Sequence, residues 1–101
     1  MSKIYDIDYF IAKFSAIPDE LWCIGEFTNT HNPEQHCAYG HCGCTPNNED
    51  NEESDALARL FRDHDLNVAS VNDADGSRLA GDFRNIPTPK ARILAALESF
   101  K

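Results

Sequence analysis

The chain has 101 residues, of which 42% are hydrophobic and 26% are charged, a balance typical of one small globular domain. Nine basic and seventeen acidic side chains leave a formal net charge of −8, which disfavours binding to nucleic-acid phosphates or to an anionic membrane surface. No window approaches the roughly 18–20 apolar residues that a membrane-spanning helix needs, and no apolar signal-peptide core follows the first methionine. We therefore expect a cytoplasmic protein with a single domain over residues 1–101 whose partner is a protein or a small ligand.

The first predicted element is an amphipathic helix over residues 6–17, where five apolar side chains fall on one helical stripe. Asp6 or Asp8 can cap its start, and Pro18 ends it because proline cannot donate into a helix. Residues 23–28 then favour a short strand or extended segment.

The middle of the chain carries a second helix-start signal. Asn32 can cap a helix, and Pro33 suits its first position, so this pattern predicts a helix from Pro33 to Cys42 or Cys44. Residues 45–55 are polar and acidic and show no periodicity, which predicts a mobile acidic loop.

The C-terminal half predicts two more helices. One covers residues 55–64 and is capped by Ser54 or Asp55, and the other begins at Thr88 and Pro89. Residues 68–71 favour a strand, residues 72–76 a turn, and residues 77–87 irregular structure. The predicted fold class is mainly α, with a small α+β fold as the alternative. Its architecture is a compact bundle of about four helices with short extended segments.

Residues 22–44 concentrate the side chains that could carry chemistry, which are Cys23, His31, His36, Cys37, His41, Cys42 and Cys44. On a helix, Cys37, His41 and Cys44 share one face, and Cys23 could complete a Cys3His zinc site. The segment has no C-x-x-C pair, and buried cysteines often serve as small core residues. We therefore expect no cofactor and keep a zinc-stabilised interaction module as an alternative.

A thiol-dependent enzyme is a second alternative. It would use Cys37 or Cys23 with a histidine as its base. Neighbouring residues on a helix do not face each other, so His36 is poorly placed to activate Cys37. No catalytic residue is assigned.

Several segments together carry a resemblance that covers nearly the whole chain. They are D-Y-F-I-A-K-F at 8–14, W-C-x-G at 22–25, C-A-x-G-H at 37–41, V-A-S-V-N-D at 68–73 and T-P-K-A-R-I-L-A-A-L at 88–97. This pattern resembles an uncharacterised family of small bacterial and phage-type proteins, which is classed only as a domain of unknown function. The resemblance implies no activity and gives no residue a catalytic role.

The sequence favours a non-enzymatic binding protein, such as a phage or mobile-element accessory protein that sequesters a nucleotide or inhibits a partner. A ligand site is expected where the motif residues converge, and it is assigned to Trp22, Tyr39, His41, Asn72, Asp73, Lys90 and Arg92. A sequestered nucleotide would require Arg59 and Arg62 to share a face with the last two of these, whereas a basic protein would favour the acidic residues 49–55.

Overall fold

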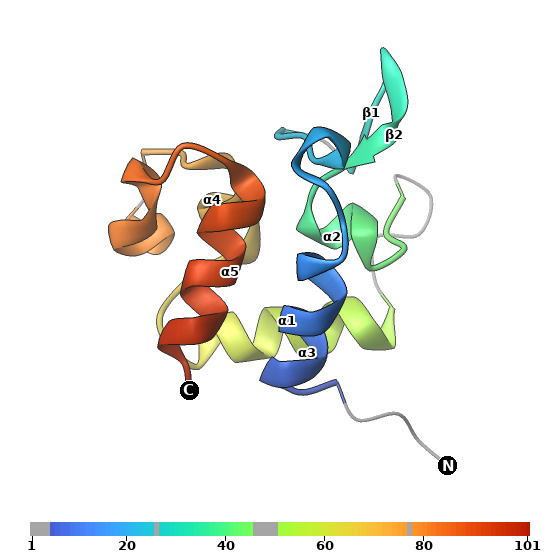
Figure 1. Ribbon diagram of the computed structural model, residues 1–101. Helices are drawn as coiled ribbons and strands as arrows, with labels where there is room; N and C mark the ends of the chain where they lie inside the picture. Colours follow the sequence, from blue (N-terminus) through green and yellow to red (C-terminus); the bar gives the residue numbers. More distant parts are fainter. Residues whose placement is uncertain (1–4, 26, 46–50, 77) are drawn as a thin grey trace.

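The computed structural model describes residues 5–25, 27–45, 51–76 and 78–101. Helices dominate this part of the chain, with one small antiparallel sheet, so the mainly α fold class is confirmed (Figure 1). In chain order the elements are α1 (Ile7–Ser15), η1 (Asp19–Leu21), β1 (Thr28–Asn29), β2 (Asn32–His36), α2 (Ala38–His41), α3 (Glu52–Arg62), α4 (Val68–Asp73), η2 (Arg78–Asn85) and α5 (Pro89–Ser99). None of the described helices is long and apolar enough to span a membrane.

The first and last helices begin where the sequence predicts. The Asp6 carboxylate accepts a hydrogen bond from the Tyr9 amide at 2.8 Å, and the Thr88 hydroxyl accepts one from the Ala91 amide at 3.3 Å. Each cap satisfies an amide that the helix itself leaves unpaired. Pro89 occupies the first turn of α5, where its missing amide hydrogen costs nothing.

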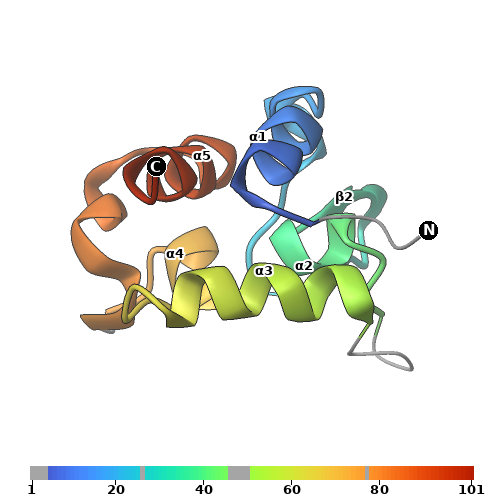
Figure 2. The same cartoon turned by 90° about the horizontal axis from the view of Figure 1, so that it is seen from below.

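The core lies between two layers of helices. Helices α1 and α5 lie side by side, and α3 crosses beneath them (Figures 1 and 2). Helices α2 and α4 pack between these elements, and the hairpin of β1 and β2 projects beyond α2 (Figure 1). The fully buried large side chains of the core include Phe10, Phe14, Leu57, Phe61, Val68, Val71, Ile93 and Leu97.

The helix predicted from Pro33 is wrong over its first half, because residues 32–36 form strand β2. This strand pairs with β1 through Thr28 opposite His36, and the Cys23 amide donates to the His36 carbonyl on its other side at 3.0 Å. A helix here would leave both neighbouring segments without backbone partners. The strand or extended segment predicted at 23–28 is found only at its end, because Thr28 begins β1 whereas Ile24, Gly25 and Phe27 lie in bends and Gly25 has φ 82°. Glu26 lies outside the described residues.

The acidic loop predicted at 45–55 is also too long. Residues 46–50 lie outside the described part of the chain, but residues 52–55 already belong to α3 rather than to a loop. Asn51 and Ser54 bond each other's backbone amides at 2.8 and 3.0 Å, which forms a capping box three residues earlier than expected. The acidic side chains of the first turn also favour the positive end of the helix dipole.

Three further local predictions are corrected by the structure. Residues 68–71 form helix α4 instead of a strand, because Asn67 caps the Ser70 amide at 3.1 Å and both valines of this segment reach the core. The turn predicted at 72–76 begins only at Ala74, which ends α4 in the left-handed region at φ 53°. The segment predicted as irregular contains η2, which is interrupted at Gly81.

Gly40 lies where α2 meets the hairpin. A Cβ at this position would collide with the backbone carbonyl oxygen of Phe27 and would lie 2.9 Å from the Cβ of His36. Both obstacles are close to the main chain, so neither can rotate away. The glycine that weakens this helix is therefore required by close packing rather than by a turn.

We expect Gly40→Ala to lower the free energy of unfolding by about 3 kcal/mol, because the hairpin must move to admit the methyl group. Gly76→Ala is the matched control, since a Cβ at Gly76 meets nothing within 4 Å. Urea unfolding followed by circular dichroism measures both variants. Equal losses in the two variants would contradict the packing role of Gly40.

Candidate functional site

Asn72 lies at the centre of a buried network of hydrogen bonds between distant parts of the chain. Its side chain is 1% exposed. Its Oδ1 accepts from the Ala38 amide at 3.0 Å, and its Nδ2 donates to the Cys23 carbonyl at 3.0 Å and to Asp73 Oδ1 at 2.8 Å. Asp73 Oδ1 also accepts from the Gly25 amide at 3.1 Å. This side-chain pair therefore holds the 23–25 segment and the start of α2 against α4.

Arg92 completes this Asn72 network from α5. Its buried guanidinium donates to the carbonyls of Val71 at 2.9 Å, Asn72 at 2.6 Å and Ile86 at 2.7 Å. Two of these carbonyls lie in the last turn of α4, where a cation is favoured by the helix dipole. Burial lowers the pKa of Arg92, and the charge of Asp73 opposes this effect. The side chain serves as a cap for α4.

Trp22 and His41 form a second cluster beside the hairpin. The Trp22 ring packs edge-on against Phe14 at 5.4 Å and lies 4.7 Å from the His41 ring. His41 Nε2 lies 3.0 Å from the Leu21 carbonyl, so this nitrogen must carry the hydrogen. Burial, followed by the neighbouring ring of His36 at 5.2 Å, lowers the pKa of His41 to about 4. The imidazole is therefore neutral at pH 7.

The residues expected to form one ligand site make different local contacts, although Asn72 bonds to Cys23 and Ala38, the chain neighbours of Trp22 and Tyr39. Asn72, Asp73 and Arg92 meet in the buried network, and Trp22 and His41 meet beside the hairpin. Tyr39 packs half-buried against the core, and burial, followed by Cys44, raises its pKa to about 12. Lys90 donates to the Ser15 carbonyl at 3.2 Å and so ties α5 to the end of α1. The amide of Asn72, the guanidinium of Arg92 and the ammonium of Lys90 all bond to the protein's own backbone.

The four cysteines are free thiols, and three of them, Cys37, Cys42 and Cys44, are buried. Burial raises the pKa of Cys37, and burial together with the charge of Glu53 raises that of Cys42. These two thiols are therefore protonated at pH 7, whereas a nucleophile or a metal ligand is a thiolate. Within the described residues, no group of three or more His, Cys, Asp or Glu side chains is arranged to hold a metal ion.

A partly buried ion pair between α1 and α3 has no signal in the sequence. Lys13 Nζ lies 2.6 Å from Glu53 Oε2, and the two side chains are only 27% and 16% exposed. Burial by itself would lower the pKa of Lys13, but the hydrogen bond and charge of Glu53 raise it. Burial and the charge of Glu53 likewise raise the pKa of Tyr9. The sequence predicts a loop at Glu53, and a residue in a loop has no periodicity from which a packing partner such as Lys13 could be inferred.

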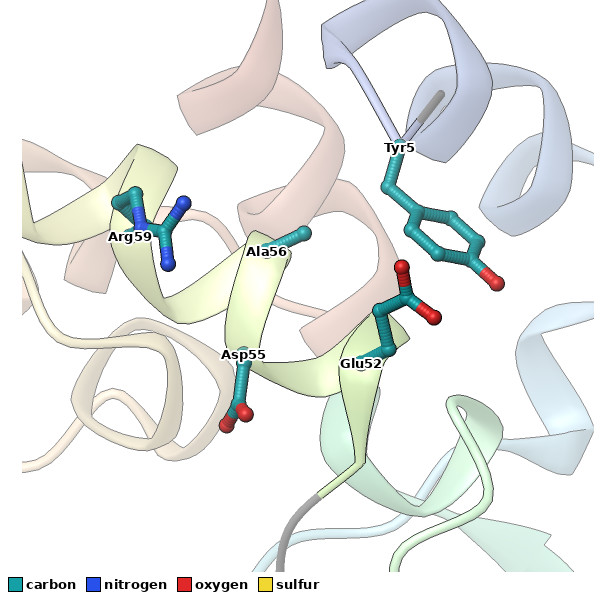
Figure 3. A pocket seen from close by; sticks show the side chains of 5 residues that line it. All are labelled: Tyr5, Glu52, Asp55, Ala56 and Arg59. Carbon is teal, nitrogen blue, oxygen red and sulfur yellow. The ribbon is translucent and has the colours of Figure 1, made fainter. Parts of the chain in front are cut away.

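A surface pocket of about 400 Å³ lies between the start of α1 and the outer face of α3. Tyr5, Glu52, Asp55, Ala56 and Arg59 line it, and the last four follow the i, i+3, i+4, i+7 spacing of one helical face. Figure 3 shows the Glu52 carboxylate raised toward the Tyr5 ring, Arg59 on the other side of Ala56, and Asp55 pointing away from the ring. We call this site the α3 pocket. Neither described salt bridge of the chain involves its charged residues.

No family model, no curated protein and no solved structure matches this chain. The resemblance to an uncharacterised bacterial and phage-type family therefore stays a prediction.

We expect Asn72→Ala to lower the free energy of unfolding by about 3 kcal/mol, because it removes three hydrogen bonds and leaves buried backbone groups unpaired. Asn85→Ala is the matched control, since Asn85 is exposed, and should change stability by less than about 0.5 kcal/mol. Chemical unfolding curves of the two variants give the comparison. A midpoint for Asn72→Ala that equals the control would contradict the central role of the amide.

The protein should also lose stability as the pH falls from about 6.5 to about 4. Over this interval His41 binds a proton in the unfolded chain, where its pKa is near 6.5, but not in the folded chain, where it is about 4. His41→Gln should therefore reduce the difference in melting temperature between pH 7 and pH 5. His31→Gln changes an exposed ring and should leave that difference intact. Identical pH profiles for both variants would refute the assignment.

Proposed function

We propose that the chain is a non-enzymatic binding protein that holds a basic protein partner at the α3 pocket. The observation that carries this proposal is that Glu52 and Asp55 line a surface pocket and take part in neither described salt bridge. Both side chains are exposed and available to a partner.

The state of the other reactive groups supports binding rather than catalysis. Cys37 and Cys42 have raised pKa values, and His41 is neutral and hydrogen-bonded to a backbone carbonyl. A thiol enzyme requires the opposite, a lowered thiol pKa beside a basic histidine. A zinc-stabilised module would need its ligands grouped around one point, and no three His, Cys, Asp or Glu side chains among the described residues are grouped in this way.

The charge distribution favours a basic protein over an anionic nucleotide. With a net charge of −8, the chain attracts cationic partners and repels phosphates at long range. A nucleotide site would need Arg59, Arg62, Lys90 and Arg92 on one face. Arg92 is buried against carbonyls, and Lys90 is engaged with the end of α1, so neither is free for a phosphate.

As part of the same proposal, the protein works in the cytosol, where its four thiols stay reduced. The role that fits a small acidic binding domain of this kind is that of an accessory or inhibitor protein, as the resemblance to phage-type proteins also suggests. Its effect would come from occupying a basic surface of its partner.

Affinity capture from cells that produce the protein tests the proposal. The double variant Glu52→Lys, Asp55→Lys reverses the charge of the pocket, so we expect it to lose a basic protein that the wild type retains at low salt. The control is the double variant Glu34→Lys, Asp82→Lys, which makes the same change in charge at two exposed residues that do not line the pocket, and it should retain that partner. Quantitative mass spectrometry compares the captured proteins, and direct titration with the purified partner gives the affinities. An identical set of proteins on all three baits would overturn the proposal.

A further inference from the structure

We propose that the occupant of the α3 pocket is an arginine side chain of the partner, seated between Glu52 and Tyr5, with an acidic group of the same partner facing Arg59. This inference rests on the proposed function and adds the identity of the recognised residue. It follows from the different chemistry of the two ends of the pocket.

The first end joins a carboxylate to an aromatic ring that is held in place. The Tyr5 ring packs edge-on against Tyr9 at 5.1 Å and lies parallel to Phe10 at 6.3 Å, so its position is set by two neighbours. Figure 3 shows the Glu52 carboxylate directed toward this ring. A planar guanidinium can pair with the carboxylate through two hydrogen bonds and lie against the ring, whereas a lysine ammonium offers only a point charge.

The other end carries the opposite charge. Arg59 follows Glu52 by seven residues, which places the two side chains about 10 Å apart along the helix axis. Between them Ala56 contributes only a methyl group, which leaves room for an incoming side chain. Arg59 repels a second cation, so the pocket should reject a continuous basic tract. It should favour a helical segment with an arginine and an acidic residue two turns apart.

A second copy of this chain is the competing occupant, because α3 itself carries Glu52 and Arg59 at the required spacing. Two chains that each carry a net charge of −8 repel each other, however, whereas a basic partner is attracted. Charge complementarity therefore favours a different protein as the source of the arginine.

Defined peptides test the inference with the full chain. The first probe is an alanine-rich helical peptide of about 16 residues with Arg and Glu seven positions apart. The second has Lys in place of Arg, and the third has a second Arg in place of Glu. We expect the wild type to bind the Arg–Glu peptide at least about fivefold more tightly than either other peptide, with NMR shifts at Tyr5, Glu52 and Arg59. Glu52→Gln should weaken binding of the Arg–Glu peptide about tenfold and remove the preference for Arg over Lys.

Arg59→Glu provides a reversal of specificity that simple unfolding cannot produce. This variant should bind the peptide with two arginines more tightly than the Arg–Glu peptide, and Asp82→Asn should keep the wild-type preferences. Equal affinity for the Arg and Lys peptides, shifts confined to another surface, or self-association in sedimentation without peptide binding would each overturn the inference. If a captured partner still depends on Glu52 and Asp55 while no arginine preference is found, the inference fails and the proposed function stands.

Discussion

The fold depends on one buried amide, the side chain of Asn72. A buried polar group is costly unless every donor and acceptor is satisfied, and here the amide bonds to the backbone of Ala38, the backbone of Cys23 and the carboxylate of Asp73. Because these partners are far apart in sequence, the network fixes the arrangement of three segments at once. Arg92 adds α5 to the same arrangement through the terminal carbonyls of α4. The polar interior of this small protein therefore specifies its topology, while the apolar side chains supply most of the driving force.

Because Asn72, Lys90 and Arg92 bond to the protein's own backbone, they are not available to a ligand. Most of the residues that the sequence assigns to a ligand site, such as His41 and Arg92, instead make contacts that stabilise the fold. Exposed charged side chains gather on the outer face of α3, which lines a pocket, whereas its inner face supplies Leu57 and Phe61 to the core. One helix thus connects the core to the proposed binding surface, and its early start at Asn51 places Glu52 in that surface.

The sequence singles out several residues that matter to the structure, but not their roles. Asn72 and Asp73 are conspicuous because a polar pair after an apolar run has no obvious packing value. Their partners are backbone groups of Cys23, Gly25 and Ala38, which are far away in the sequence, so the sequence does not show that the pair bonds internally. The sequence assigns a basic protein partner, as one alternative, to the acidic residues 49–55, and two of these, Glu52 and Asp55, line the α3 pocket. Their helical spacing was missed because the capping box of Asn51 and Ser54 lacks the usual glutamate, and Tyr5 gave no local signal at all.

The sequence by itself determined the mainly α fold class, the starts of α1 and α5, and the acidic charge, because composition, helical periodicity and caps act over a few neighbouring residues. Only the tertiary structure decided that residues 32–36 form a strand and residues 68–71 a helix. Both segments are short, and a short segment adopts the conformation in which distant neighbours satisfy its backbone and bury its side chains. The net charge of −8 follows from the composition alone. Only the tertiary structure, by placing the residue before α1 beside α3, brings Glu52, Tyr5 and Arg59 together in the α3 pocket.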